Sequence, residues 1–141
     1  MLKNIPNILS PELLKILMEM GHGDELVIAD GNFPAAAMAK RLIRLDGHGV
    51  CEVLSAVLKL FPLDTYEDKS VGLMEVVPGD NVQPVIWDDY VKIIKESGEP
   101  FESFEFIERF EFYNRAKNAF AVVATSESAL YANIIIKKGV I

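Results

Sequence analysis

The chain has few of the residues that many functional classes require. It contains a single cysteine, Cys51, so no disulfide can form within it. No stretch approaches the roughly 20 apolar residues of a transmembrane helix, and residues 1–6 lack the apolar run of a secretory signal. These absences predict a soluble, cytoplasmic protein without a membrane partner.

Positive charge is also scarce. The 14 Lys and Arg residues are outnumbered by 21 Asp and Glu residues, which gives a formal net charge of −7. A surface that binds nucleic acid or an anionic membrane neutralises phosphates with clustered cations. The charge balance therefore argues against both kinds of partner.

Sequence motifs for metals and cofactors are missing as well. There is no Gly-x-Ser-x-Gly elbow and no glycine-rich phosphate loop. His22, Asp24 and Glu25 are close in sequence, but their spacing matches no strong metal-ligand pattern. We therefore expect neither a metal nor a cofactor, although a metal-dependent isomerase or aldolase using His22 and Asp24 is an alternative.

The residues that are present suit one globular α/β or α+β domain spanning residues 1–141, because predicted helices and strands alternate along the chain. Half of the residues are hydrophobic, which is more than a small lone domain hides easily and favours contacts between subunits. Periodicity and caps predict helices over residues 11–20, 34–41, 50–61, 86–97 and 110–117. Strands are predicted over residues 26–29, 41–45, 70–77, 119–124 and 132–137, whereas residues 101–108 are ambiguous.

Two positions near the first predicted strand could carry chemistry. His22 lies between two glycines in the link from helix to strand, where an exposed imidazole could act as a general acid or base. It could equally be an ordinary loop histidine, and His48 occupies a similar Gly-His-Gly segment. Asp30 ends a buried strand, where ligands collect in open α/β sheets, although it could merely cap the turn at Gly31.

The second half of the chain adds polar candidates. Arg109 opens an aromatic-rich segment and could reach a ligand, whereas Phe110, Tyr113 and Ala116 could simply pack at helical spacing. Tyr131 and Asn133 enter the last strand and offer the donors and acceptors that suit a polyol. They could also serve only to fix the start of that strand.

Taken together, these segments resemble the family of L-fucose mutarotase and D-ribose pyranase. The resemblance runs from the first residues to the last, with little in residues 63–104. It is carried by Leu2-Lys3, residues 8–14, Glu19 with Met20-Gly21-His22-Gly23-Asp24-Glu25, Asp30, Phe33-Pro34-Ala35, Arg44 with Asp46-Gly47, Arg109-Phe110, Phe112-Tyr113, Tyr131, Asn133 and Lys137-Lys138-Gly139.

The resemblance implies a single three-layer α/β domain with a mostly parallel central sheet flanked by helices. It also implies a ring-shaped homodecamer that acts on a monosaccharide without a cofactor. His22 would be the catalytic proton donor and Asp30 a substrate-binding group. Sugar contacts would come from Arg109 and from the stretch Tyr131, Ala132 and Asn133.

The resemblance narrows the reaction to the interconversion of sugar anomers. Ring opening needs one proton delivered to the ring oxygen and one removed from the anomeric hydroxyl, which is acid–base work. Tyr131 is the candidate for the second transfer, directly or through water. An arginine at position 109 resembles the fucose branch of the family, whereas the resemblance implies a histidine at this position in the ribose branch. Interconversion of D-ribose forms, a non-catalytic monosaccharide-binding module and a purely structural ring protein are the alternatives.

Overall fold

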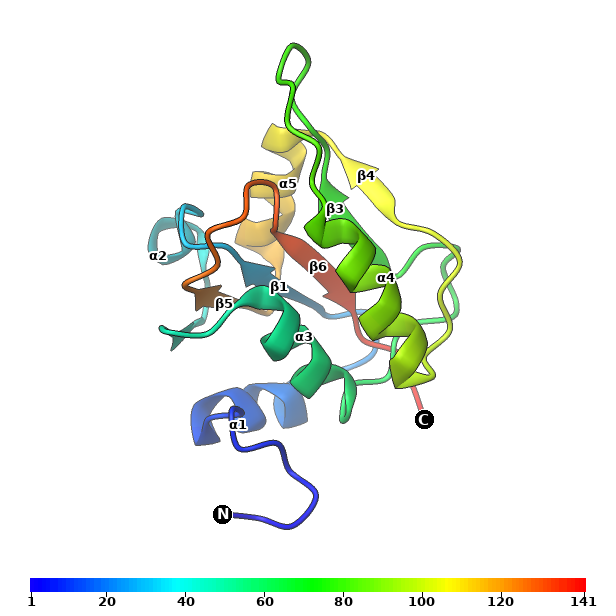
Figure 1. The fold of residues 1–141 in the computed structure, drawn as a ribbon. Helices are drawn as coiled ribbons and strands as arrows, with labels where there is room; N and C mark the ends of the chain where they lie inside the picture. The colour runs from blue at the N-terminus through cyan, green and yellow to red at the C-terminus, as the bar shows by residue number, and fades with distance from the viewer.

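A six-stranded sheet forms the centre of the structure, a computed structural model that describes residues 1–141 (Figure 1). The strand order is β2-β5-β1-β6-β3-β4. Strand β6 pairs antiparallel with β1 and β3, and the remaining pairs are parallel, which confirms a mostly parallel sheet. The strands are β1 (Glu25–Ala29), β2 (Leu42–Leu45), β3 (Val71–Met74), β4 (Glu105–Ile107), β5 (Ala121–Thr125) and β6 (Ile134–Lys137).

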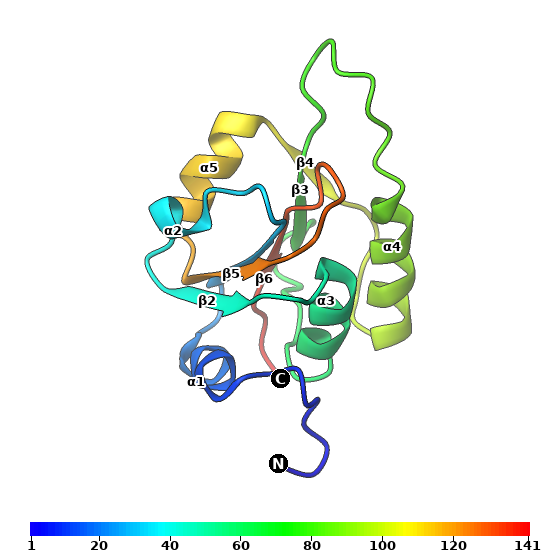
Figure 2. The same ribbon diagram turned by 60° about the vertical axis from the view of Figure 1, so that its left-hand side comes forward.

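Helices cover both faces of this sheet, so the expected three layers are confirmed (Figure 2). Along β1, Leu26 and Ile28 pack into one core cluster, whereas Val27 and Ala29 pack into the other. Helices α1, α3 and α4 bury residues in the first cluster, and α2 and α5 in the second. The helices are α1 (Pro11–Glu19), α2 (Ala35–Met38), α3 (Val50–Leu58), α4 (Ile86–Ser97) and α5 (Arg109–Asn118). None of them is long and apolar enough to cross a membrane.

The ends of several elements differ from the sequence-based prediction. The helix predicted over residues 34–41 is a single turn, because Ala39 is already extended and the chain enters β2. The ambiguous residues 101–108 contain β4, a short strand at the edge of the sheet. The predicted strand over residues 70–77 stops at Met74, and residues 75–85 form a loop that stands clear of the body of the molecule in Figure 1.

The antiparallel direction of β6 determines what meets at each edge of the sheet. The start of β6 lies beside the carboxyl ends of β1 and β3, and its end lies beside their amino ends. Residues before β6 are therefore close to Asp30, which follows β1. Residues after β6 are close to the loop that precedes β1. In Figures 1 and 2, the N- and C-termini lie at the end of the molecule opposite the 75–85 loop.

The segment after β6 is held against the loop that follows α3. Lys138 forms an antiparallel bridge with Leu63, and the Gly139 N–H donates to the Pro62 carbonyl oxygen at 2.8 Å. A Cβ atom on Gly139 would overlap the carbonyl oxygen of Leu63 and lie 2.9 Å from the Cα atom of Asp64. Only glycine permits this close approach of two backbones.

We therefore expect Gly139→Ala to lower the free energy of unfolding by about 1–3 kcal/mol, the usual cost of overpacking. Denaturant unfolding measures this change. Gly21→Ala is the matched control, because its Cβ would have Asp24 Oδ2 as nearest neighbour at 3.8 Å, an ordinary contact. Equal stability of the two variants would contradict the close approach at Gly139.

Candidate active site

A pocket of about 240 Å³ opens at the carboxyl edge of the sheet, where α/β proteins commonly bind ligands. It is smaller than the roughly 300–1,000 Å³ typical of pockets for drug-sized ligands, so it suits a small molecule. It brings together four of the predicted site residues: Asp30, Arg109, Tyr131 and Asn133. The rest of the lining comprises Asn32, Phe33, Met74, Val77, Asp80, Tyr113 and Leu130.

Asp30 is the buried carboxylate of this pocket, with 5% of its surface exposed. Its Oδ1 atom accepts a hydrogen bond from the Asn32 N–H at 3.0 Å, as expected for a turn-capping aspartate. Its own N–H donates to Asn133 Oδ1 at 2.8 Å, which joins two predicted site residues. Burial raises the pKa of Asp30 above its ordinary value, although hydrogen bonds from its neighbours oppose the shift. Capping and ligand binding are therefore compatible roles for this residue.

Tyr131 is fixed by hydrogen bonds at both ends of the residue. Its hydroxyl donates to Asp80 Oδ2 at 2.6 Å and accepts from the Val77 N–H at 3.3 Å. Its carbonyl oxygen accepts from the indole Nε1 of Trp87 at 2.8 Å. The hydrogen bond to Asp80 raises the pKa of the Tyr131 hydroxyl. The phenol is therefore held in its protonated form at the rim of the pocket.

Ala132 contributes through its backbone. Its side chain is fully buried in the core, and its carbonyl oxygen accepts from the Tyr90 hydroxyl at 2.6 Å. Its N–H hydrogen bonds to Asp30 and is one of the groups that oppose the rise in the Asp30 pKa. The backbone of Ala132 therefore helps to orient the Asp30 carboxylate in the pocket.

Arg109 begins α5 and leaves its guanidinium exposed at the pocket. Its Nε donates to the Tyr113 hydroxyl at 3.3 Å, and the guanidinium carbon lies 5.6 Å from the centre of the Tyr113 ring. The alternative that Phe110 packs inward is wrong, because Phe110 is 68% exposed. Phe112 is buried in its place, whereas Ala116 is buried and Tyr113 packs against the core, as that alternative expects.

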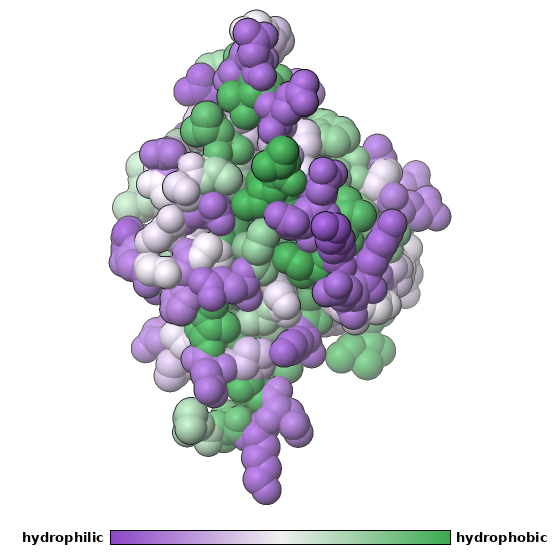
Figure 3. Space-filling view, viewed as in Figure 1, coloured by the Kyte–Doolittle hydropathy of each residue, from purple (hydrophilic) through white to green (hydrophobic).

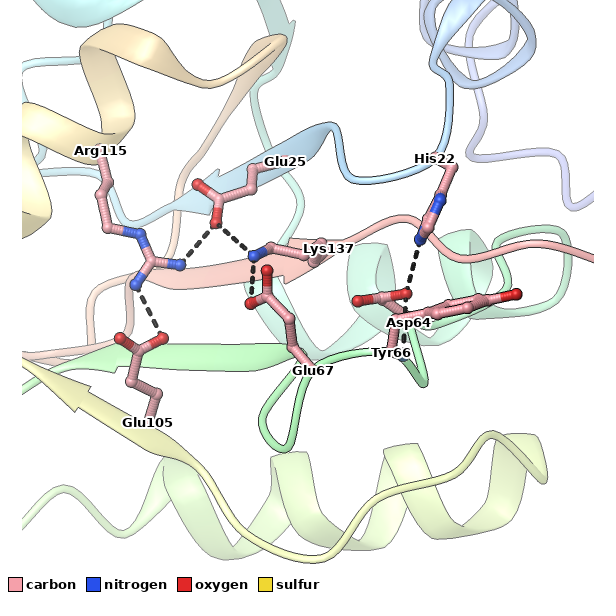
Figure 4. Close-up of polar contacts among 8 residues, drawn as sticks. All are labelled: His22, Glu25, Asp64, Tyr66, Glu67, Glu105, Arg115 and Lys137. Carbon is pink, nitrogen blue, oxygen red and sulfur yellow. Dashed lines mark hydrogen bonds and ion pairs between the residues drawn. The ribbon is translucent and has the colours of Figure 1, made fainter.

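His22 lies at the opposite end of β1 from Asp30. At about 3.3 Å per residue, the length of β1 alone separates the two ends by roughly 13 Å. Figure 4 shows the imidazole pointing toward Asp64, and its Nε2 lies 2.9 Å from Asp64 Oδ1. The Tyr66 ring lies beside it, with ring centres 4.9 Å apart. Within one chain, Asp64 therefore orients His22, and Asp30 does not contact it.

Asp64 is a second buried carboxylate, with a pKa shifted in the opposite direction. Burial alone would raise its pKa, but hydrogen bonds from His22 and from the N–H groups of Tyr66 and Glu67 outweigh burial and lower it. An ionised carboxylate only accepts hydrogen bonds, so Nε2 of His22 carries the proton of this contact. The Nδ1 atom has no partner within the chain and is the nitrogen available to a ligand.

Ion pairs brace the loop that carries Asp64 (Figure 4). Lys137, at the end of β6, binds Glu67 at 2.5 Å and lies 3.9 Å from Glu25. Arg115 links Glu25 to Glu105, at 2.5 and 2.7 Å. The Asp64 N–H also donates to the Lys137 carbonyl oxygen at 3.0 Å. The position of the His22–Asp64 pair therefore depends on the end of β6.

Three other residues, His48, Cys51 and Asp24, belong neither to the pocket around Asp30 nor to the His22–Asp64 pair. His48 pairs with Glu52 at 3.1 Å where α3 begins. Cys51 packs against the core, and burial raises the pKa of its thiol to about 11. Asp24 accepts from the Gly21 N–H at 2.8 Å and so closes the loop that holds His22. The chain contains no cluster of three or more His, Cys, Asp or Glu side chains with metal-binding geometry.

Sequence reasoning missed Asp64 and Asp80. Asp80 follows the strand-ending Pro78-Gly79 turn, the same kind of signal that singled out Asp30. Asp64 had no comparable signal, because its contact with His22 joins residues 42 positions apart in the chain. Only the pairing of the chain around the end of β6 brings the two together.

Residues 3–141 match the model of the RbsD / FucU transport protein family. The chain belongs to this family. Its match covers almost the whole sequence, including both groups of site residues.

Relatives within the RbsD / FucU family are similar over their full length. The chain is 54% identical to the fucose mutarotase of Danio rerio, with 99% of this chain and 94% of the relative covered. It matches the crystal structure of the fucose mutarotase of Streptococcus pneumoniae in complex with L-fucose with a TM-score of 0.94, at 51% identity and 99% coverage of both chains. Bacillus subtilis RbsD complexed with D-ribose gives a TM-score of 0.77 at 26% identity, covering 100% of this chain and 99% of RbsD.

We expect Asp64→Asn to lower the free energy of unfolding at neutral pH by about 1–3 kcal/mol, the usual penalty for disturbing a buried hydrogen-bonded group. The folded-state pKa of Asp64 is lowered, so its carboxylate stabilises the fold above its unfolded pKa. That contribution disappears as the pH falls through the folded-state pKa. Denaturant unfolding across the acid range should therefore show wild type and variant converging at low pH.

Asp68→Asn is the matched control for this prediction. Asp68 is exposed in the same loop and makes no side-chain hydrogen bond or ion pair. Its variant should follow wild type at every pH. A difference between Asp64→Asn and wild type that persists unchanged in acid would contradict a stabilising Asp64 carboxylate.

Proposed function

We propose that this chain interconverts the α and β anomers of L-fucose by opening and closing the sugar ring. The observation that carries the proposal is the pocket that gathers Asp30, Arg109, Tyr131 and Asn133 at the carboxyl edge of the sheet. Full-length relatives at about half identity that are named fucose mutarotases support it, as does the neighbour solved with L-fucose.

The reaction needs one proton donor and one acceptor. A proton must reach the ring oxygen while the anomeric hydroxyl loses its own, after which the C1–ring oxygen bond breaks and the C1 carbonyl forms. Rotation about the C1–C2 bond and closure on the other carbonyl face give the second anomer. Asp30, Asn133 and Arg109 would hold sugar hydroxyls, Tyr131 would take the anomeric proton, and His22 would serve the ring oxygen through Nδ1.

A complete site of this kind requires two copies of the chain, because His22 and Asp30 lie at opposite ends of β1. The His22 side chain is 43% exposed and is free to meet a neighbouring molecule. The same end of the chain carries an apolar groove of about 730 Å³, lined by Leu2, Ile5, Leu14, Leu17, Met18, Leu60, Pro62 and residues 138–141. Apolar residues also reach the surface between hydrophilic ones in Figure 3. Such surface favours self-association, and a homodecamer is the assembly we propose.

L-Fucose is the sugar favoured over D-ribose. The fold lies closer to the fucose-complexed neighbour than to the ribose-complexed one, by TM-score and by identity. The resemblance of Arg109, at the pocket rim, to the fucose branch supports the same choice. The single cysteine and the absence of a membrane-spanning helix suit the cytoplasmic setting that we propose for this sugar chemistry.

The decisive experiment is NMR saturation transfer between the α and β anomeric protons of L-fucose. Wild type should accelerate the exchange above its rate in water, and His22→Ala should lower that acceleration by about 10²–10⁴-fold, the range for positioned proton transfer. His48→Ala is the control and should match wild type. Binding of L-fucose with exchange at the water rate would identify a non-catalytic binding module instead, and acceleration with D-ribose alone would reassign the sugar.

Mixing two inactive variants tests whether the site is shared. His22→Ala and Asp30→Asn chains are each expected to be inactive as pure assemblies. Co-expression places wild-type His22 and wild-type Asp30 on neighbouring chains, so about a quarter of the sites in a random assembly would regain both residues. Recovery of anomer exchange in the mixed assembly is the expected result. Inactivity of a mixed assembly, verified by mass spectrometry, would place His22 and Asp30 in the same chain's site.

A further inference from the structure

The carboxylate of Asp80, which has no role in the reaction proposed above, is hydrogen-bonded to Tyr131. The Tyr131 hydroxyl donates to Asp80 Oδ2 at 2.6 Å, and both residues line the Asp30 pocket. Asp80 comes from the 75–85 loop, which follows β3, whereas Tyr131 precedes β6. Two segments far apart in sequence thus place a carboxylate directly behind a phenol that faces the pocket.

Asp80 is fixed by its own turn. The Asp80 N–H donates to the Val77 carbonyl oxygen at 3.0 Å, and Gly79 has a φ of 89°. Proline followed by a left-handed glycine is the signature of a type II turn. The second carboxylate oxygen, Oδ1, accepts from the Val82 N–H at 3.1 Å. Both oxygens are therefore oriented, and Oδ2 is committed to the phenol.

Tyr131 is held in a backbone conformation that a non-glycine residue rarely adopts, with a φ of 57°. Conformations of this kind are energetically costly and persist where the surroundings impose them. The Trp87 indole on the Tyr131 carbonyl and the Asp80–Val77 contacts on its hydroxyl supply that constraint. With its proton directed to Asp80 and one lone pair facing Val77, the phenol oxygen keeps one lone pair for a ligand hydroxyl.

We propose that Asp80 is a positioning residue that orients the Tyr131 proton and receives it during ring opening. In that step the anomeric O–H proton moves to Tyr131 Oη as the Tyr131 proton moves to Asp80 Oδ2. The electron pair of the anomeric O–H bond forms the C1 carbonyl, and the C1–ring oxygen bond breaks. The ring oxygen takes that electron pair and a proton from protonated His22. Closure runs the same transfers backwards, so both groups return to their starting charge.

No other group in the pocket could replace Asp80 in this relay. The remaining charged or titratable side chains of the lining are Asp30, at the end of β1, and Arg109 and Tyr113, on α5. None of them forms a hydrogen bond with the Tyr131 hydroxyl, whose partners are Asp80 and the Val77 N–H. Arg109 has no proton acceptor to offer, and Asp30 is engaged with Asn32.

The inference rests on the proposed anomer exchange, and Asp80→Asn tests it because the amide can still accept a hydrogen bond but cannot take up a proton. We expect its kcat for L-fucose anomer exchange to fall by about 10²-fold or more, with KM nearly unchanged. Asp80→Glu should restore part of the activity. The double variant Asp80→Asn/Tyr131→Phe should have the same kcat as Tyr131→Phe alone, since both substitutions disable the same proton relay.

Asp88→Asn is the matched control, because it removes an exposed carboxylate at the start of α4 and should leave exchange unchanged. A second measurement needs no sugar: titration of the Tyr131 phenol by ¹³C NMR, assigned with Tyr131→Phe, should show a lower pKa in Asp80→Asn than in wild type. Retention of wild-type kcat within about threefold in Asp80→Asn, or an unchanged Tyr131 titration, would overturn the inference. Absence of exchange in wild type would instead refute the proposed function, and the titration would still decide whether the Asp80–Tyr131 pair forms.

Discussion

The antiparallel pairing of β6 between β1 and β3 is the constraint on which both groups of site residues depend. Its first residues reach the carboxyl edge, where Asn133 binds the backbone of Asp30. Its last residues reach the other edge, where the Lys137 carbonyl binds the Asp64 backbone. A parallel strand in this position would carry its following residues to the Asp30 edge and would leave the His22 loop without a brace. One strand direction thus positions candidate site residues at both ends of the sheet.

The two buried carboxylates are tuned in opposite directions by their neighbours. Asp30 sits behind neutral hydrogen-bond donors, so burial prevails and its pKa is raised. Asp64 faces an imidazole and two backbone N–H groups, so hydrogen bonding prevails and its pKa is lowered. When their environments shift the pKa values of two similar groups in opposite directions, one group becomes suited to act as an acid and the other as a base. Asp64 thereby remains an acceptor for the hydrogen bond from His22, whereas Asp30 lies buried among neutral donors at the other end of β1.

Local sequence signals predicted the elements but not their ends. The helix from Pro11 follows from its Ser10 cap, which accepts from the Leu13 N–H at 3.1 Å, and the buried strand at 26–29 follows from its apolar run. The end of β3 was missed, because Glu75 and Val76 continue a strand-like pattern after the ladder with β4 has stopped. The mostly parallel sheet came from family resemblance, and the reversal of β6 was not predicted, since pairing between distant segments leaves no local trace.

For the candidate site too, local signals identified individual residues but not their contacts with distant segments. Asp30, Tyr131 and Asn133 were found from strand-end signals and resemblance, and the sheet brings them together because β1 and β6 are neighbours. His22 carried the strongest motif, yet the pattern could not tell that Asp64 would be its partner or that β1 would separate it from Asp30. The carboxylates Asp64 and Asp80 act through contacts formed only after folding, with residues 42 and 51 positions away.

The separation of His22 from Asp30 changes what the apolar character of this chain means. A small domain with half of its residues hydrophobic leaves apolar side chains such as Met18, Leu60 and Val140 on its surface, near the end that carries His22. Burying them against a second copy stabilises an assembly through the hydrophobic effect. If the same contact delivers His22 to a neighbour's pocket, folding alone does not produce an active protein. Catalysis then depends on association of the subunits. Surface substitutions at positions distant from the site residues would abolish catalysis by separating two intact half-sites.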